Sequence, residues 1–396
     1  RAYISLRESL RHRVMRIAVK RVVGVKDLCR VRPIANTSMS RVFRVEVPLD
    51  KDLCPSAPTF GLAVKQVSLT SALKRRAVLN EISVLRRLNG TGDFIGFLGS
   101  KVFTNEAYIL MEVAEGSLLD LLKRPAVANP SALQPGELVV ALQQCRTVGG
   151  SRVPEGARGI VLQNDGESVA VDFAGRGRQR VLQDRAHCLG SVGGLDIRAS
   201  LLIQLLRGLA RLEADGLQHH DVKPGNCLIK GKCRSALDCR LVLADFESTC
   251  GRGVPGVKQC SLEGTLRYAS PEYAQAGIDK GARGWFPKGD VWAAGIVAFE
   301  LLVGRFPMHV YTGQRESMEY LAWRARPLDD LREGEASEWR SLLEGMLRPN
   351  EMQRISAQRA YELAVEIASG LGIPEPPANE FPTLPRGLFA VSPKDT

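Results

Sequence analysis

The chain has 396 residues, of which 44% are hydrophobic and 24% are charged, and its formal net charge is +11. This length and composition are typical of a globular protein with a large buried core. No run of about 20 apolar residues occurs, so a membrane span is not expected. The sequence starts at Arg1 rather than Met, so the lack of a targeting peptide is not informative.

Residues 1–29 combine positive charge with apolar side chains at helical spacing. Four apolar residues recur at steps of four, four and three, as on one face of a helix: Leu6, Leu10, Val14 and Ile17. Such a basic amphipathic helix could lie on an anionic membrane surface, or it could pack on the following domain with its basic face in water.

Strand and helix signals alternate over the next hundred residues. Two apolar runs predict strands, at about 42–47 and 62–67. A helix is expected over 71–88, because a serine can cap its start and apolar residues recur along one face. Residues 107–113 predict a buried strand, and residues 117–123 predict a short helix.

Residues 125–195 have a different pattern, rich in glycine, arginine and short strand signals. The tripeptide at 164–166, Asn-Asp-Gly, separates two such signals and predicts a β-hairpin. In the second strand Val169, Val171 and Phe173 should share one face. We therefore expect a small β-rich insert, such as an SH3-like barrel, that either binds a protein partner or is a tolerated surface insertion.

The segment 219–226, His-His-Asp-Val-Lys-Pro-Gly-Asn, places an acid, a lysine and an amide on one short loop. Such a set can accept a proton from a hydroxyl, neutralise a phosphoryl oxygen and hold a metal ion. A leucine-rich helix is expected before this loop. After it, a strand at 241–244 leads to Asp245, and two further motifs lie at 264–272 and 289–295.

This order of motifs resembles that of eukaryotic-type Ser/Thr protein kinases, in which H-R-D-x-x-x-x-N is followed by D-F-G. Segments 264–272 and 289–295 are similar to the G-T-x-x-Y-x-x-P-E and D-x-W-x-x-G motifs of that superfamily. Arg354 resembles the arginine that pairs with the glutamate of the first motif, here Glu272.

The resemblance implies an α+β, bilobal protein-kinase-like fold with a small β-rich insert in the large lobe. The domains that it implies are a basic N-terminal extension at 1–29, a small lobe and hinge at 30–114, a large lobe at 115–371 that contains the insert at 125–195, and a proline-rich tail at 372–396.

The resemblance also implies the roles of the catalytic loop. Asp221 would be the catalytic base, and Lys223 would neutralise charge on the transferred phosphoryl group. Asn226 and Asp245 would hold Mg²⁺, with Mn²⁺ as an alternative. The spacing of Lys223 after Asp221, together with Thr265, points to serine or threonine rather than tyrosine as the acceptor.

ATP is the cofactor that the resemblance implies. Lys65 at a strand end and Glu81 on the following helix would form the pair that meets the phosphates. The other nucleotide contacts that it implies are Ile34, Val42, Ala63, Met111, Glu112, Val113 and Leu228.

The chain departs from the family pattern in its phosphate-covering loop at 34–43. Ala35, Thr37 and Ser40 stand where the family has glycines, which let the backbone approach phosphates closely. Losing a few backbone contacts should weaken nucleotide binding by roughly tenfold to a hundredfold.

Two further departures lie near the catalytic centre. His220 stands where the family has the arginine that receives an activation-loop phosphate, so we expect activity to be independent of that phosphorylation. Glu247 stands where D-F-G has glycine, and it adds a carboxylate beside the expected metal ions.

The nine cysteines include no C-x-x-C pair, which argues against a zinc site. Five of them come late in the chain: Cys227, Cys233, Cys239, Cys250 and Cys260. In a secreted protein one or two disulfides could form there, whereas in a cytosolic protein these residues would be thiols.

A kinase without the glycine loop that keeps its lysine, base and metal ligands is similar to the rhoptry-like secreted kinases of coccidian parasites. A plastid-type kinase of an alga is the rival assignment. The first implies a secreted or vacuolar location, and otherwise the location would be cytoplasmic or plastid. We expect an ATP- and Mg²⁺-dependent Ser/Thr kinase acting on proteins, or alternatively a pseudokinase scaffold, and no nucleic-acid partner.

Overall fold

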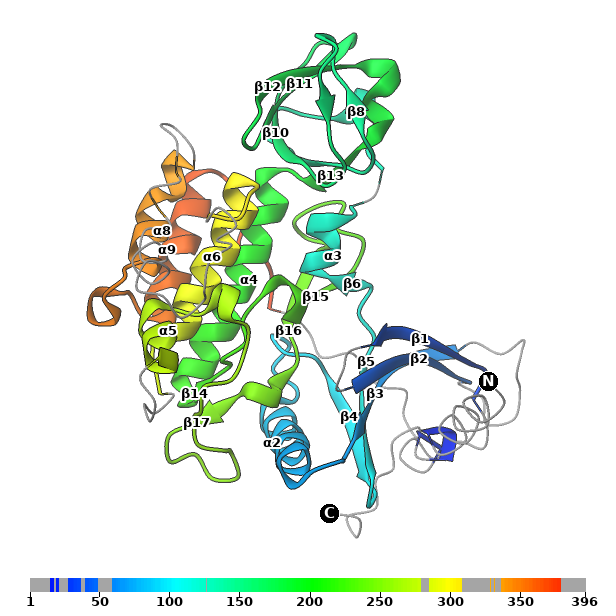
Figure 1. Ribbon diagram of the computed structural model, residues 1–396, viewed down its shortest axis with the longest axis vertical. Helices are drawn as coiled ribbons and strands as arrows, with labels where there is room; N and C mark the ends of the chain where they lie inside the picture. Colours follow the sequence, from blue (N-terminus) through cyan, green and yellow to red (C-terminus); the bar gives the residue numbers. More distant parts are fainter. Residues whose placement is uncertain are drawn as a thin grey trace. The chain divides into compact units, whose positions relative to one another are not determined.

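The computed structural model shows an α+β chain that divides into two compact units, with the boundary between Ala114 and Glu115 (Figure 1). The structure describes residues 15–17, 19–20, 28–36, 40–48, 59–125, 127–278, 285–307, 328, 331 and 336–378.

The first unit is built on one antiparallel sheet with the strand order β1-β2-β3-β5-β4. Its strands are β1 (Arg30–Asn36), β2 (Ser40–Pro48), β3 (Thr59–Ser68), β4 (Phe97–Val102) and β5 (Glu106–Glu112). Helix α2 (Ala72–Leu88) follows β3. As predicted, Ser71 caps this helix by accepting a hydrogen bond from the backbone N–H of Lys74. The predicted apolar face of α2 is buried and consists of Val78, Ile82, Leu85 and Leu88.

The described part of the N-terminal segment packs into the core of this sheet. Met15 and Val19 are fully buried in the same hydrophobic cluster as Val45, Leu62 and Tyr108. Ile17 was predicted on the apolar face, but its side chain is exposed. The prediction was wrong at this position because the buried face passes through Met15 and Val19 instead. The other three positions of the predicted face, Leu6, Leu10 and Val14, lie outside the described residues.

The second unit is mainly helical outside its insert. Its helices are α3 (Leu118–Lys123), α4 (Leu195–Ala214), α5 (Pro271–Ile278), α6 (Gly289–Val303), α8 (Arg340–Met346) and α9 (Ala357–Gly370). Its short strands outside the insert are β6 (Gly116–Ser117), β14 (Leu217–Gln218), β15 (Cys227–Lys230), β16 (Arg240–Leu243) and β17 (Cys250–Gly251). Strands β16, β15 and β6 form one small sheet, and β14 pairs with β17.

Helices α4 and α6 form the core of the second unit, because most of the residues of each helix are buried. All six leucines that predicted a buried α4 are buried: Leu201, Leu202, Leu205, Leu206, Leu209 and Leu212. Gly295 of α6 lies against Leu347, and a Cβ at this glycine would come within 2.7 Å of a leucine methyl group. A glycine is therefore required for this close contact.

The insert is the small β domain at the top of Figure 1. Its strands are β7 (Leu138–Ala141), β8 (Cys145–Arg146), β9 (Arg152–Val153), β10 (Arg158–Asn164), β11 (Ser168–Phe173), β12 (Gly177–Leu182) and β13 (Leu189–Gly193). Five of them form an antiparallel sheet in the order β12-β11-β10-β7-β13. The predicted hairpin at 164–166 joins β10 to β11, and Val169, Val171 and Phe173 are buried together in a core that belongs to the insert.

Buried charges attach the insert to the helices of the second unit. Arg158 on β10 forms an ion pair with Glu300 on α6 at 3.0 Å, and the Glu300 side chain is only 5% exposed. Arg198 on α4 donates to the backbone oxygens of Gly136 in the insert and Leu301 on α6. These contacts fix the insert to α4 and α6 because a buried charge is stable only when it is paired.

No helix within the described residues is both long and apolar enough to cross a membrane. The described part of the proline-rich tail, residues 372–378, contains no helix or strand after its first turn. Arg207 of α4 donates to the backbone oxygen of Pro376 at 3.0 Å, so this part of the tail lies along α4. The rest of the tail falls outside the described residues.

Candidate active site

The first unit contains the lysine–glutamate pair that the sequence predicted. Lys65 lies within β3 and not at a strand end as predicted, because β3 continues to Ser68. Glu81 lies on α2, and Nζ of Lys65 donates to both carboxylate oxygens of Glu81 at 2.8 and 2.9 Å. Their side chains are 8% and 1% exposed. Because a lysine stem is flexible, this buried pair is what holds the ammonium group at a defined place on the sheet.

Other predicted nucleotide contacts lie on the same sheet. Ala63 on β3 and Met111 on β5 face each other as Cα partners, and Val42 on β2 is the partner of Lys65. Ala63 and Met111 are buried, whereas the Ile34 side chain on β1 is exposed. The strands therefore bring an apolar surface and the Lys65 ammonium group together within the first unit.

Glu112 and Val113 follow Met111 at the end of β5. The Glu112 carboxylate accepts a hydrogen bond from the backbone N–H of Gly96 at 3.0 Å and is buried. Because this carboxylate is buried within the first unit, Glu112 can contact an adenine ring only through its backbone groups.

The hairpin between β1 and β2 carries the residues that replace the family glycines. Ala35 is the Cα partner of Val42, and the pairing becomes irregular between Pro33 and Ala35. Ser40 begins β2. Residues 37–39, which include Thr37, lie outside the described residues. The strands on either side of the loop thus form without the glycines.

In the second unit, Asp221 is the centre of a hydrogen-bond network. Thr265 Oγ1 donates to Oδ1 of Asp221 at 2.7 Å, and Nζ of Lys223 donates to Oδ2 at 2.6 Å. Asn226 donates from Nδ2 to the same Oδ2 at 2.9 Å and to the Asp221 backbone oxygen at 2.8 Å. Lys223 also donates to Thr265 Oγ1 at 2.8 Å. The structure thus unites the predicted base, lysine and amide, and adds Thr265.

Residues 219–220 of the catalytic loop are held by hydrogen bonds to α6 and to Ala244, which precedes Asp245. Both carboxylate oxygens of Asp290 accept from backbone N–H groups, those of His219 at 2.6 Å and His220 at 2.9 Å. The buried His219 ring contacts the backbone oxygen of Ala244 through Nε2 at 3.1 Å. Asp290 and His219 therefore set the position of the backbone from which Asp221 projects.

Asp245 follows β16 and has a left-handed backbone conformation, with φ of 66°. This conformation is uncommon for a residue other than glycine, and such positions concentrate at functional sites. The backbone N–H of Ala244 donates to the backbone oxygen of Asn226 at 2.9 Å, which holds the segments of the two predicted metal ligands together. Leu228, a predicted nucleotide contact, lies half-buried on β15 just after Asn226.

The side-chain oxygen atoms of Asn226 and Asp245 are suitable ligands for a hard divalent cation. Both hydrogen bonds of the Asn226 amide nitrogen go to Asp221, so Oδ1 is the atom that this side chain offers to a ligand. A carboxylate and an amide oxygen on adjoining segments are the donor types that Mg²⁺ takes. The residues present therefore fit the group that the sequence motif implies.

His220 lies where the family pattern has arginine, and it also has a left-handed backbone, with φ of 64°. Its Nε2 lies 2.9 Å from Oε1 of Gln218. Burial lowers the pKa of His220 below its ordinary value of 6.5, although the Asp290 carboxylate acts in the opposite direction. The imidazole is therefore neutral at neutral pH and does not supply the fixed charge of an arginine.

We expect His220 to make the protein less stable at acidic pH. Its folded-state pKa is lowered, so below about pH 6.5 the unfolded chain binds more protons than the native chain, and the free energy of unfolding falls as pH falls. His220→Gln should reduce this loss between about pH 8 and about pH 5.5, as measured by urea unfolding.

His187 provides the control for this measurement because its side chain is exposed on the insert. His187→Gln controls for the replacement of a histidine by glutamine as such. The same acid destabilisation in His220→Gln and in the wild type would show that His220 does not contribute to it.

A pocket opens beside Asp221 within the second unit. Its lining includes Asp221 and Thr265 together with the aromatic residues Tyr268, Tyr273 and Phe286. The pocket thus places an apolar surface next to a carboxylate, an arrangement that suits a side chain carrying a reactive hydroxyl group.

The predicted pair of Arg354 and Glu272 is present. Arg354 donates to both carboxylate oxygens of Glu272, at 2.7 and 2.9 Å, and its side chain is fully buried. The guanidinium group lies 5.1 Å from the centre of the Trp292 ring. This bidentate pair fixes the start of α5, directly after the segment that carries Thr265.

Sequence reasoning missed three features of the site. Gln218 contacts His220 and Phe286, Asp290 holds the loop backbone, and the disulfide partners beside His220 are Cys250 and Cys260, a pairing that the sequence left open. The motif at 289–295 contained Asp290, and this aspartate could have been assigned a role from it. Gln218 carried no comparable signal, because its role depends on the contact with Phe286.

Comparisons with known proteins agree with this geometry. Residues 179–364 match a family model described as the protein kinase domain. The chain is 29% identical over 204 residues to the serine/threonine-protein kinase cds1 of Schizosaccharomyces pombe, which covers 51% of this chain and 42% of that protein.

Two further similar proteins are a plant and a mouse kinase. The chain is 33% identical over 162 residues to mitogen-activated protein kinase kinase 9 of Arabidopsis thaliana, covering 39% of this chain and 48% of that protein. It is 34% identical over 153 residues to the serine/threonine-protein kinase SBK1 of Mus musculus, covering 37% of this chain and 32% of that protein. The chain thus matches less than half the length of each of these relatives.

Proposed function

We propose that this chain, a divergent member of the eukaryotic-type Ser/Thr protein kinase superfamily, transfers the γ-phosphoryl group of ATP to serine or threonine hydroxyls of proteins. The observation that carries the proposal is the network in which Asp221 accepts hydrogen bonds from Lys223, Asn226 and Thr265.

In this proposal Asp221 orients the acceptor hydroxyl and takes its proton. Its side chain is 11% exposed, and it borders the pocket in which a substrate side chain would lie. The ammonium group of Lys223, 2.6 Å from Asp221, can neutralise negative charge that develops on the transferred group. Phosphoryl transfer needs positioning and charge neutralisation more than covalent chemistry, and these residues supply both.

Lys65 is the residue of the first unit that would meet the phosphates, and Glu81 holds its ammonium group in place. Asn226 and Asp245 would hold Mg²⁺, which when bound neutralises phosphate charge and orients the phosphoryl group. Thr265 supports serine or threonine as the acceptor, because this residue, which pointed to that acceptor in the sequence, contacts both Asp221 and Lys223.

The test is transfer of radiolabelled γ-phosphate from ATP to a mixture of protein substrates in the presence of Mg²⁺. The wild type should label protein, and Asp245→Ala should reduce labelling to background because it removes a ligand to the metal. Asp184→Ala is the matched control, since Asp184 is exposed on the insert, and it should leave labelling unchanged. Equal labelling by wild type and Asp245→Ala would overturn the proposal.

A pseudokinase scaffold is the second candidate. It is favoured by one observation, the replacement of glycine by Ala35, Thr37 and Ser40 in the loop that would cover the phosphates. Nucleotide binding by the wild type without any labelling above the Asp245→Ala background would support this alternative.

The disulfides support an oxidising compartment. Within the described residues, bonds join Cys145 to Cys188, Cys233 to Cys239 and Cys250 to Cys260. Disulfides persist in secreted and luminal proteins and are rare in the cytosol. We therefore favour the secreted or vacuolar location over a cytoplasmic one.

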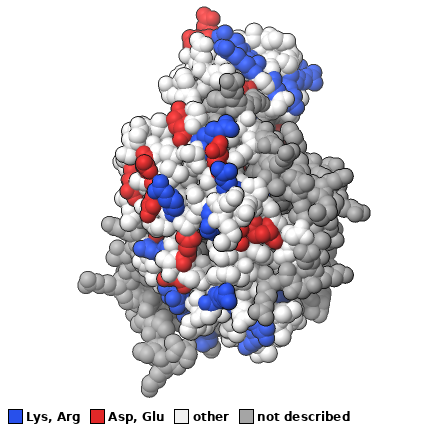
Figure 2. Space-filling view, turned by 90° about the vertical axis from the view of Figure 1, so that its left-hand side faces the viewer, with Lys and Arg blue, Asp and Glu red and all other residues white. Residues whose placement is uncertain are grey.

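Binding of a protein partner by the insert and binding of an anionic membrane by residues 1–29 remain predictions. Figure 2 shows lysines and arginines gathered on the upper part of the visible face, with acidic side chains at its top, and charges of both signs interspersed below. Several arginines of the insert are exposed, among them Arg146, Arg152, Arg176 and Arg178. An acidic segment of a protein is the partner that this surface would suit.

A further inference from the structure

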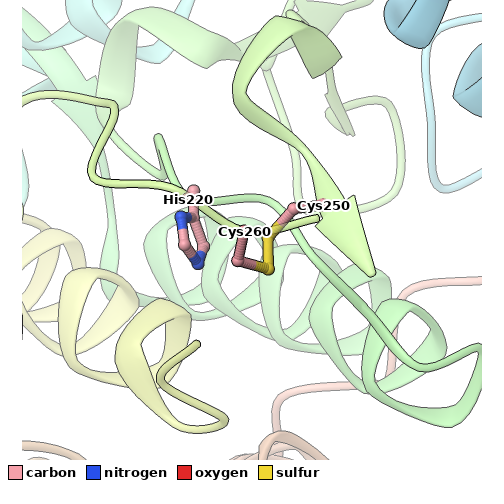
Figure 3. A group of neighbouring side chains, drawn as sticks. All are labelled: His220, Cys250 and Cys260. Carbon is pink, nitrogen blue, oxygen red and sulfur yellow. A yellow bond between two sulfur atoms is a disulfide. The ribbon is translucent and has the colours of Figure 1, made fainter. Parts of the chain in front are cut away.

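A disulfide lies in the segment that links Asp245 to Thr265. It joins Cys250 and Cys260, which are ten positions apart, and it lies beside the His220 ring (Figure 3). In the family pattern this segment is the activation loop, which a phosphate can order through the arginine of the catalytic loop.

The first end of the disulfide is anchored to the catalytic loop. Cys250 is fully buried and begins β17, which pairs with β14 so that Gln218 and Cys250 are Cα partners. Strand β14 ends directly before His219. Cys250 therefore belongs to the same small sheet that leads the chain to Asp221.

The second end of the disulfide, Cys260, lies near a side chain of strand β14, that of Gln218. Sγ of Cys260 lies 3.9 Å from Oε1 of Gln218. That oxygen also contacts Nε2 of His220 at 2.9 Å and the backbone N–H of Phe286 at 3.4 Å. One buried amide therefore connects the disulfide, the catalytic loop and the residues that precede α6.

Hydrogen bonds also hold the residues between Cys260 and Thr265 in place. Glu263 accepts hydrogen bonds from Ser261 Oγ, from Lys258 and, at its backbone oxygen, from the Tyr273 hydroxyl. Two positions later Thr265 donates to Asp221. A restraint at Cys260 therefore lies only five residues from a hydrogen bond to the proposed catalytic base.

His220 would bind a phosphate on this segment poorly. The ring is buried, and burial lowers its pKa, so at neutral pH it lacks the fixed charge and the paired donors with which arginine binds a phosphate. His220, which stands where the family has its phosphate-binding arginine, instead lies beside the Cys250–Cys260 disulfide.

We propose that the Cys250–Cys260 disulfide takes the place of an activation-loop phosphate, by holding residues 250–265 in the conformation that brings Thr265 to Asp221. The catalytic consequence rests on the proposed kinase function, whereas the ordering of the segment does not. The free thiol of Cys227 does not exchange with this bond, because burial raises its pKa to about 12.

The chain offers a matched control. Cys233 and Cys239 form another short-range disulfide in the same unit, six positions apart, between β15 and β16. The test variant is Cys250→Ser with Cys260→Ser, and the control variant is Cys233→Ser with Cys239→Ser. Both remove one disulfide and two sulfur atoms, but only the test variant frees the segment beside His220.

The first readout is hydrogen exchange of backbone amides, which requires no activity. In the test variant the amides of 250–265 should exchange at least about tenfold faster than in the wild type, while α4 and α6 keep their protection. The control variant should show wild-type exchange in this segment. Equal protection of 250–265 in the test variant and the wild type would overturn the proposal.

The second readout separates positioning from general damage. In the test variant kcat/KM for a serine peptide should fall about tenfold to a hundredfold, while KM for ATP stays within about twofold of the wild type. Equal losses in the control variant would overturn the proposal, because they would show that losing any disulfide has this effect.

Reduction of the wild type tests the same idea without a mutation. Each disulfide takes two electrons and two protons from dithiothreitol, which closes to its cyclic disulfide. Reduction should lower kcat/KM for the peptide, oxidised glutathione should restore it, and the test variant should not respond. Treatment of the wild type with a phosphatase should leave activity unchanged, and a loss on that treatment would overturn the proposal.

Failure of the two proposals can be told apart. If the wild type labels no protein, the kinase function fails, while hydrogen exchange of reduced and oxidised wild type still decides whether the disulfide orders the segment. If labelling is normal and exchange is unaffected by reduction, only the role of the disulfide fails.

Discussion

Asp221→Asn should lower kcat by about 10²- to 10⁴-fold, which is the usual contribution of a positioned general base. An amide cannot accept the proton of the acceptor hydroxyl. It would also turn a donor towards Nζ of Lys223, which now donates to Oδ2 at 2.6 Å. KM for ATP should change little, because Lys65, which we propose meets the phosphates, lies with Glu81 in the first unit.

The measurement is steady-state transfer to a serine peptide at saturating ATP. Asp184→Asn is the control, since this exposed residue of the insert makes no contact with the catalytic loop, and it should keep wild-type kcat. Thermal unfolding of each variant would show that the fold survives. If Asp221→Asn kept half of the wild-type kcat, Asp221 would not be the base.

Arg354→Met should destabilise the second unit by about 3 to 5 kcal/mol, the cost of removing one partner of a buried ion pair. Arg354 is fully buried and bidentate with Glu272, and it also donates to the backbone oxygens of Lys288 and Arg348. A methionine would fill part of the space but remove the donor to the carboxylate and to the Arg348 carbonyl, whereas the Lys288 carbonyl would keep the backbone N–H of Trp292.

Urea unfolding followed by tryptophan fluorescence measures this loss. Arg359 is the control, because its side chain is about half exposed and pairs with Glu362 on the surface of α9. Arg359→Met should cost less than about 1 kcal/mol. Removing both partners, with Glu272→Gln added to Arg354→Met, should cost less than the sum of the single changes, since no carboxylate then stays unpaired. An Arg354→Met midpoint equal to that of Arg359→Met would contradict the expectation.

Much of the candidate site could be predicted because its chemistry requires particular residue types in a fixed order. Lys65 and Glu81 are 16 positions apart, which suits a strand, a turn and part of a helix, and they form the buried pair expected of them. The pair of Arg354 and Glu272 was also predicted, from the two motifs that contain these residues.

Other features depend on packing and left no pattern in the sequence. Arg158 and Glu300 are 142 positions apart, and neither belongs to a periodic run, so the attachment of the insert to α6 could not be predicted. The N-terminal segment shows a related failure. Helical spacing placed Ile17 on the apolar face, but the sheet of the first unit buries Met15 and Val19.

The cysteines show most clearly where sequence information ends. Sequence limited the late cluster to one or two disulfides in a secreted protein, and two are present, Cys233–Cys239 and Cys250–Cys260. Which cysteines pair depends on how close folding brings them, and spacing alone does not determine this.

The sequence by itself determined which chemical groups the catalytic loop carries, because Asp221, Lys223 and Asn226 act within six consecutive residues, and loop geometry keeps such neighbours close. Only the tertiary structure decided what holds that loop. Asp290 reaches it from α6, and Cys250 reaches it through the pairing of β17 with β14. These contacts join segments far apart in the chain, and they exist because burial of α4 and α6 brings those segments together.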